Sequence, residues 1–163
     1  MRGIEMKKRL LSLLVCSIML TCFMINASAV TVVSVDENIE YFSDGSYATI
    51  TIEDTTGVAA RGTTLLKSGN KVYTYRDSNG KEQYKITLHG EFKVNTGVSS
   101  VCTVATIRVD ISNNVWKVLS QSASKSGNQA RGTAELRRYL LLIPVETVEK
   151  TLTLTCDKNG NLS

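Results

Sequence analysis

Apolar and polar side chains alternate closely along the middle of the chain. The residues that fall on one side of this alternation are Tyr84, Ile86, Leu88, Phe92 and Val94. A period of two residues is typical of a β-strand with one buried face and one solvated face. A shorter alternating run, residues 71–76, precedes this segment and predicts its partner strand.

The connection between these two runs contains Asn79-Gly80. This dipeptide favours a two-residue type I′ turn, because both central residues of that turn adopt positive φ. The turn would pair Tyr75 with Tyr84 and Tyr73 with Ile86. Such a register collects the apolar residues on one face, so this hairpin is predicted to form the centre of the fold.

A second hairpin is predicted around Asp44-Gly45, which would pair Tyr41 with Ala48 and Ile39 with Ile50. The segment before it, 30–37, is a first strand or a frayed terminus. Residues 55–70 lose the alternation and contain three glycines. We expect a loop or linker there, with a short edge strand at 63–67.

The next predicted strands cover residues 101–112 and 115–123. In the first of them, Cys102 lies on the opposite side of the alternation from Ala105 and Ile107. An inward-facing Cys102 therefore requires a β-bulge or a sheet that is covered on both faces. The second strand carries Trp116, the single tryptophan of the chain.

Residues 133–143 combine helix-forming composition with a following proline, which fits either a helix end or a hairpin. Turn residues lie on both sides of this segment, and strict alternation continues from Val148 to Cys156. These features favour two strands around a turn at Ile143-Pro144-Val145.

About eight short strands without a convincing helix predict an all-β fold. The expected form is an antiparallel β-sandwich, and the alternative is a small closed β-barrel. Cys102, Trp116 and Cys156 follow the order that is typical of immunoglobulin domains. However, Leu154 stands where those domains have a tyrosine, and only seven residues follow Cys156. We therefore expect immunoglobulin-like architecture with a non-standard topology.

The first 29 residues have the three parts of a secretory signal peptide. Lys7-Lys8-Arg9 is followed by a 16-residue apolar run and by Ala27-Ser28-Ala29. An uncleaved anchor is the alternative, but the run is short for a membrane span. We expect one β domain, residues 30–163, that is secreted or held at the cell envelope, without stable membrane insertion after cleavage.

Cleavage changes both the charge and the cysteine content. It takes four basic and one acidic residue from totals of 19 and 15, which leaves 15 basic and 14 acidic residues. This balance gives no support to a nucleic-acid partner. Cys102 and Cys156 remain, and an exported pair favours a disulfide between them. The alternative is two buried free thiols.

Several short segments carry a resemblance when they are taken in order. They include Tyr41-Phe42-Ser43-Asp44-Gly45-Ser46-Tyr47, Val72-Tyr73-Thr74-Tyr75, Arg138-Tyr139-Leu140 and Leu154-Thr155-Cys156-Asp157. In this order they resemble a set of small exported proteins common in Gram-positive gut anaerobes, over nearly the whole of residues 30–163. The resemblance implies export and a β domain, and it implies no activity and no functional residue.

Candidate catalytic groups are few. His89 is the single histidine and lies on the polar face of its strand, where we expect it to pair across the sheet. A hydrolase or thiol-dependent enzyme would need it beside an activated nucleophile such as Cys102 or Cys156. The acidic candidates for sugar chemistry, which lie on solvated faces, are Glu91, Asp110, Glu135 and Glu146. No catalytic residue, metal-ligand set or cofactor motif is predicted.

The leading hypothesis is therefore an exported, non-enzymatic binding module at the cell envelope or outside the cell. Its partner would be a protein, a glycan or the cell wall. Phe42 and Tyr47 face away from the apolar side of the first hairpin and form the candidate binding surface. The alternatives are the small secreted hydrolase or thiol-dependent enzyme, and a β-barrel that carries an apolar small molecule.

Overall fold

The computed structural model describes residues 33–57, 60–61 and 64–163, and the predicted signal peptide lies outside these residues. The described part is all-β and forms two antiparallel sheets. The larger sheet has the order β1 (Val33–Tyr41), β2 (Tyr47–Asp54), β4 (Thr64–Arg76), β5 (Glu82–Asn95) and β6 (Ser99–Ile111), with β3 (Ala60–Arg61) paired to β4. The smaller sheet contains β7 (Trp116–Ser126), β8 (Gln129–Leu140) and β9 (Ile143–Thr155).

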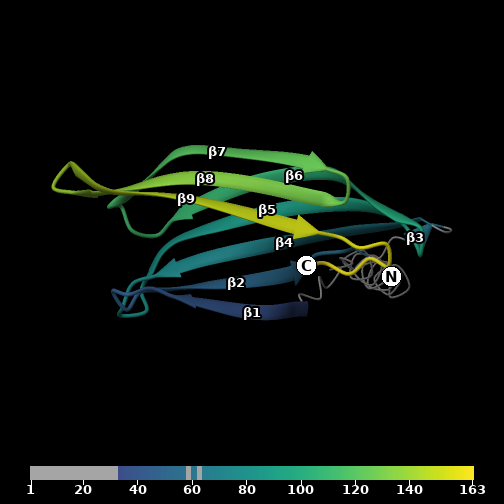
Figure 1. The fold of residues 1–163 in the computed structure, drawn as a ribbon, viewed down its shortest axis with the longest axis horizontal. Helices are drawn as coiled ribbons and strands as arrows, with labels where there is room; N and C mark the ends of the chain where they lie inside the picture. Colours follow the sequence, from purple (N-terminus) through teal and green to yellow (C-terminus); the bar gives the residue numbers. More distant parts are fainter. Residues whose placement is uncertain (1–32, 58–59, 62–63) are drawn as a thin grey trace, which may run out of the picture.

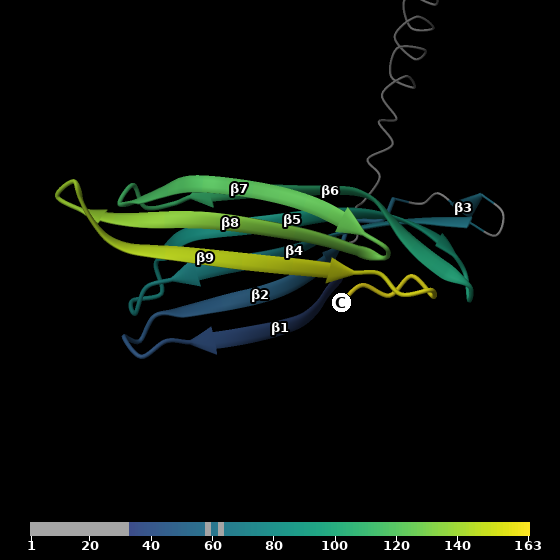
Figure 2. The ribbon, with the colours of Figure 1, turned by 45° about the horizontal axis from the view of Figure 1, so that its top comes forward.

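The two sheets lie face to face, which confirms the predicted β-sandwich (Figure 1). The sheets do not join into a cylinder, since β1, β6, β7 and β9 are all edge strands. The closed-barrel alternative is therefore wrong. Apart from the short β3, each sheet is a meander of strands that are neighbours both in sequence and in space, and the chain crosses between sheets once, after β6 (Figure 2). This order is not the Greek key of immunoglobulin domains, so the non-standard topology is confirmed.

The buried face of β5 forms the centre of the core, as its alternation predicts. The inward side chains of this strand, none more than 1% exposed, are Tyr84, Ile86, Leu88, Phe92 and Val94. The smaller sheet covers them with buried residues that include Ala134, Leu136, Leu152 and Leu154. One continuous apolar cluster therefore holds the two sheets together.

The β4–β5 hairpin has the predicted pairing but a different turn. Tyr75 pairs with Tyr84, and Tyr73 pairs with Ile86. Only Gly80 of the turn has positive φ, at 79°. The turn runs from Asp77 to Lys81, where the Asp77 amide donates to the Lys81 carbonyl at 3.0 Å. This longer loop would shift the register by one residue, and a bulge just after the turn restores it.

The β1–β2 hairpin uses the same kind of turn without a bulge beside it. Tyr41 therefore pairs with Tyr47 rather than with Ala48, and the predicted register is wrong by one residue. The cause is local. The Asp44 carboxylate accepts a hydrogen bond from the backbone amide of Ser46 at 3.0 Å, and Gly45 adopts φ of 81°. These features select a three-residue loop instead of the predicted two-residue turn.

The predicted loop at 55–70 is too long, because β4 already begins at Thr64. Gly69 lies inside this strand, where an added Cβ atom would clash with Cδ1 of Leu162. The glycine thus marks a close contact rather than a turn. Leu162 belongs to a C-terminal hook that folds back after β9, closed by a bridge between Cys156 and Leu162.

Two further expectations concern β6 and β8. Of the two alternatives for an inward Cys102, the structure has the bulge, since Glu91 pairs with Val104 while Phe92 pairs with Cys102. Residues 133–140 are strand rather than helix. The following turn lies at Leu141–Leu142, so its predicted position around Pro144 is wrong. Pro144 instead lies at the start of edge strand β9, where a missing amide is tolerated.

Candidate functional site: an aromatic cleft

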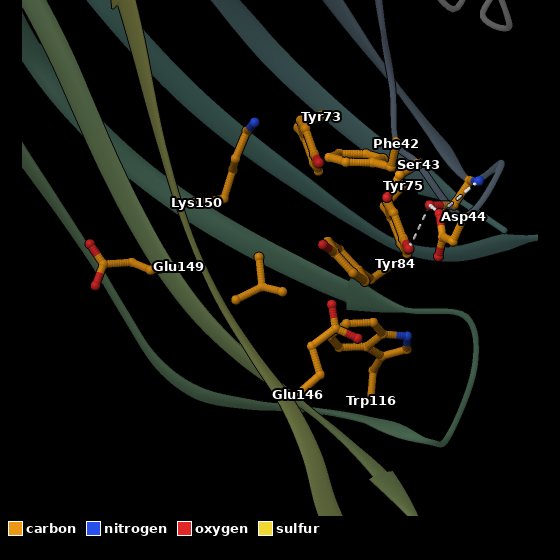
Figure 3. Close-up of a pocket in the computed structure, with 12 residues that line it drawn as sticks. Phe42, Ser43, Asp44, Tyr73, Tyr75, Tyr84, Trp116, Glu146, Glu149 and Lys150 are labelled. Carbon is orange, nitrogen blue, oxygen red and sulfur yellow. Dashed lines mark hydrogen bonds between the residues drawn. The ribbon is translucent and has the colours of Figure 1, made fainter.

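An open cleft of about 450 Å³ lies between the β1–β2 turn and strand β9. It is lined by Phe42, Ser43, Asp44, Ser46, Tyr73, Tyr75, Tyr84, Trp116, Glu146, Val148, Glu149 and Lys150. These residues come from both sheets, and aromatic rings from β4, β5 and β7 gather on one side of it (Figure 3). The cleft exists because the larger sheet extends beyond β9, the last strand of the smaller one (Figure 1).

The floor of the cleft is a cluster of packed aromatic rings. The ring centroid of Tyr84 lies 5.1 Å from that of Tyr75 and 4.9 Å from that of Trp116. The Tyr84 and Trp116 pair meets edge to face, and both side chains are almost completely buried. Burial raises the pKa of the Tyr84 hydroxyl well above its ordinary value. This floor is therefore packed, buried and uncharged.

Trp116 reaches the floor because of a corner that connects the two sheets. Gln83, the buried residue beside the β4–β5 turn, accepts hydrogen bonds at its backbone carbonyl from the amides of Ser112 and Asn113, both at 3.0 Å. The Gln83 amide side chain donates to Asp77 at 2.8 Å and accepts from Asn113 at 2.7 Å. This network turns the chain out of β6 and delivers Trp116 at the first position of β7.

The rim of the cleft on the β1–β2 side carries Phe42, which is 38% exposed. Its ring meets that of Tyr75 edge to face, with a centroid separation of 5.7 Å. The Tyr75 hydroxyl donates to Ser46 Oγ at 3.0 Å, and Ser46 Oγ donates to the Asp44 carboxylate at 2.5 Å. These Ser46 hydrogen bonds lower the pKa of Asp44, so this carboxyl is ionised and poorly suited to act as a general acid.

Two of the charged residues that line the cleft, Lys150 and Glu146, are each paired with a residue of opposite charge. Lys150 Nζ lies 2.9 Å from the Glu40 carboxylate and 4.4 Å from the centroid of the Tyr73 ring. On the other side, Arg138 pairs with Glu146 at 2.9 Å and lies 6.0 Å from the Trp116 ring centroid. The aromatic rings of Tyr73 and Trp116, which could otherwise bind a cationic ligand, therefore already have protein cations beside them. The arrangement is better suited to an uncharged ligand.

The predicted binding surface is divided by the structure. Phe42 lines the cleft, whereas Tyr47 is absent from its lining and packs beside Tyr41, with a ring centroid separation of 6.0 Å. The register that places Tyr41 opposite Tyr47 explains this separation. Only Phe42 therefore belongs to the candidate site.

His89 lies on the outer face of the larger sheet, as expected. Its Nδ1 is 2.9 Å from the side-chain oxygen of Asn70, its partner on β4, and its Nε2 is 3.7 Å from Glu91. Cys102 and Cys156 are buried on the inner side of the sandwich. The geometry therefore separates the imidazole from both thiols, and it offers no cysteine–histidine pair for catalysis.

The structure does not contain the predicted disulfide, because Cys102 and Cys156 are both free thiols. The backbone amide of Cys102 donates to the carbonyl of Gly127 in the β7–β8 turn at 2.8 Å. The amide of Cys156 donates to the carbonyl of Asn128 in the same turn at 3.1 Å. The Cys102 sulfur lies 3.2 Å from the carbonyl oxygen of Val104, and the Cys156 sulfur lies 3.6 Å from that of Asp157. Burial raises the pKa of both thiols, which suppresses the reactive thiolate. Trp116 lies at the other end of β7 from this pair, unlike the immunoglobulin arrangement.

The acidic candidates do not converge. Glu91 lies beside His89 on the outer face, Asp110 pairs with Arg108 at 2.7 Å, and only Glu146 reaches the cleft. Within residues 33–57, 60–61 and 64–163, no group of three or more candidate ligands could hold a metal ion. Nor does this part of the chain contain a helix long and apolar enough to cross a membrane.

Sequence reasoning missed most of the cleft. Tyr75, Tyr84 and Trp116 have the pattern of ordinary core residues, and nothing local indicates that three strands bring them to one opening. Comparison with known proteins adds no functional information: no family model, curated protein or solved structure matches the chain.

Proposed function

We propose that this protein is an exported, non-enzymatic binding module that holds a neutral glycan in the aromatic cleft. The single observation that carries the proposal is the composition of the cleft, in which a packed aromatic floor is bordered by Glu146 and Lys150, whose charges are already paired. A sugar ring combines apolar C–H faces with hydroxyl groups. Such a ligand can pack against Phe42 and Tyr75 while its hydroxyls bind Glu146 or Lys150.

A binding role is supported over hydrolysis by the state of the acids. A glycosidase needs one carboxyl that stays protonated and a second that is placed across the scissile bond. Asp44 has a lowered pKa, and Glu146 is held by Arg138. The secreted hydrolase and the thiol-dependent enzyme remain less well supported alternatives, and the loss of the barrel removes the basis for the apolar carrier.

The proposal can be tested with the fluorescence of Trp116, because this is the single tryptophan and lies in the floor of the cleft. The protein would be used in the form that its expression host secretes. Neutral cell-wall and dietary oligosaccharides would then be titrated into it. We expect a saturable change in tryptophan emission with at least one of them. Binding should weaken about tenfold in Phe42→Ala, since this truncation removes an aromatic ring from the rim.

Tyr47→Ala is the matched control, because it removes an aromatic ring from the same hairpin but outside the cleft lining. Affinity should be unchanged in this variant. Equal losses in the two variants, or the absence of any saturable response across the glycan set, would contradict the proposal. Release of reducing ends during incubation would support the hydrolase alternative instead.

A further inference from the structure

The hairpin between β8 and β9 ends in six consecutive residues without a polar side chain: Leu140, Leu141, Leu142, Ile143, Pro144 and Val145. We call these residues the apolar tip. Leu141 and Leu142 are each 90% exposed, and the other aliphatic side chains of the tip are between 48% and 65% exposed. The tip extends beyond the ends of the neighbouring strands in both views (Figures 1 and 2). It is the most concentrated exposed apolar feature of the described residues.

The backbone of the tip is also unfavourable for its sequence. Leu141 has φ of 48° and Leu142 has φ of 70°, so the two residues form a turn with positive φ at both central positions. Asn-Gly or Gly-Gly adopts this backbone conformation readily, whereas leucine is strained in it. Exposed and strained side chains that stabilise nothing in the fold are typical of functional positions.

We propose that the apolar tip is a membrane-docking element, which enters the boundary between headgroups and acyl chains of a bilayer that contains anionic lipids. This inference goes beyond ligand binding in the cleft and does not depend on it. Six residues are too few to span a bilayer, so the attachment is interfacial and reversible. It is therefore compatible with the expectation that the exported domain has no stably inserted segment.

The distribution of apolar groups favours lipid over a protein partner. Successive residues of a strand point to opposite faces, and every position from Leu140 to Val145 is apolar. The tip is consequently apolar on all sides, whereas a protein-docking surface needs only one apolar face. Leucine and valine are also under-represented among the residues that dominate protein interfaces.

The base of the tip has the composition expected at headgroup depth. Tyr139 directly precedes the tip, and Lys117 Nζ lies 5.1 Å from the centroid of its ring. Arg137 is the strand partner of Lys117, and Arg138 pairs with Glu146. These residues next to the tip therefore include three cations and one carboxylate. Tyrosine and basic residues are enriched at the interface, where basic groups attract anionic lipids.

The backbone geometry is suited to entering an apolar phase. The strand pairing of β8 with β9 continues to Leu140 and Ile143, so the hairpin is closed right up to its two-residue turn. Pro144 carries no amide hydrogen. Few peptide groups would thus lose their hydrogen bonds to water on shallow insertion.

The test is flotation of the protein with vesicles of phosphatidylcholine and phosphatidylglycerol, and with vesicles of phosphatidylcholine alone. The protein is used in the form that its expression host secretes. Its N-terminus is established by mass spectrometry, because residues 1–29 contain a separate apolar run that could itself bind lipid. We expect binding to the mixed vesicles and weaker binding to the neutral ones. The double variant L141N/L142G should bind roughly tenfold less or weaker still, because it removes both fully exposed leucines.

This variant keeps the protein folded, because Asn-Gly is the preferred sequence for a turn of this geometry. Its thermal midpoint should equal or exceed that of the wild type, which separates loss of binding from loss of structure. Val98→Asn is the matched control, since Val98 is 70% exposed in the β5–β6 turn but has no apolar neighbours of this kind. Vesicle binding should be unaffected by that change.

Three results would overturn the proposal. The first is absence of wild-type binding to every vesicle preparation. The second is equal binding by the wild type and L141N/L142G. The third is a wild-type oligomer that the double variant converts to a monomer while neither protein floats with lipid, which would assign the tip to contact with a second copy of the chain.

Discussion

A Cβ atom placed on Gly132 would lie 2.8 Å from Cδ1 of Ile107, so the backbone of β8 directly contacts a side chain of β6. The same atom would lie 2.9 Å from Cδ1 of Leu88 on β5. The two sheets are in close contact around this glycine, because its small size leaves room for Ile107 and Leu88. Its φ is not in the left-handed region, so space rather than backbone conformation requires glycine here.

Gly132→Val should therefore destabilise the protein by about 1–3 kcal/mol or more, because the added methyl groups overpack a filled core. Urea unfolding followed by circular dichroism would measure the loss. Gly57→Ala is the matched control, since nothing lies within 4 Å of the position of its Cβ atom. A loss of similar size at both glycines would show that the close packing at Gly132 has no energetic role.

Gln83→Ala should destabilise the protein by about 1–3 kcal/mol, because it removes the buried Gln83 side chain and leaves the half-buried side chain of Asn113 without its acceptor. It should also shift the emission of Trp116, which the corner delivers into the cleft. Asn114→Ala, at an exposed neighbouring position, should change stability by less than about 0.5 kcal/mol. An unshifted emission spectrum in Gln83→Ala would show that the corner does not position the tryptophan.

Stability should fall as the pH drops below about 4. Burial opposes ionisation of Asp54, but hydrogen bonds from Lys67 and Thr56 outweigh it and lower the pKa of this carboxyl. Because the pKa of Asp54 is lower in the folded than in the unfolded protein, its ionised form stabilises the fold. This contribution is fully present at pH values above the unfolded-state pKa. This stability is lost as the pH falls through the folded pKa. The midpoint of urea unfolding should therefore decrease between pH 5 and pH 3, and less steeply in Asp54→Asn. Equal slopes for both proteins would contradict this assignment.

The thiols of Cys102 and Cys156 should be unreactive in the folded protein and reactive after unfolding. Burial raises the pKa of both, so the thiolate fraction near pH 8 is small. Titration with a thiol reagent should give no fast phase under native conditions. In denaturant, a chain from which residues 1–29 have been removed should give two reactive thiols. The Cys102→Ser variant should give one. A count of zero in denaturant without reductant would show that the disulfide forms in solution.

The strand pattern was predictable where local signals agreed with burial. Alternation identified the inward face of β5, and the parity of Cys102 predicted either a bulge or a sheet covered on both faces, of which β6 contains the bulge. Turn positions were harder. At Asp44 a side-chain hydrogen bond extends the loop, and at Leu141–Leu142 two residues adopt a conformation that leucine disfavours. No propensity argument predicts a turn at two leucines, because their local preference opposes it.

The candidate site was less accessible to sequence reasoning than the fold. Phe42 was identified from its position beside a turn. Its neighbour Tyr75 comes from β4, and Trp116 comes from the other sheet. Their meeting depends on the crossover at Gln83, which is a tertiary feature without a local pattern. The apolar tip had a readable signal, an aliphatic run placed at a predicted turn, but its exposure became evident only once the turn was located.

The single crossover between the sheets has a consequence for biogenesis. All strands of the larger sheet precede all strands of the smaller one, so a chain that emerges from its N-terminus can complete the first meander before β7 is available. Until the second meander arrives, the apolar face of β5 has no cover. The interval between the two is therefore the stage at which the nascent protein is most vulnerable to aggregation and most dependent on chaperones.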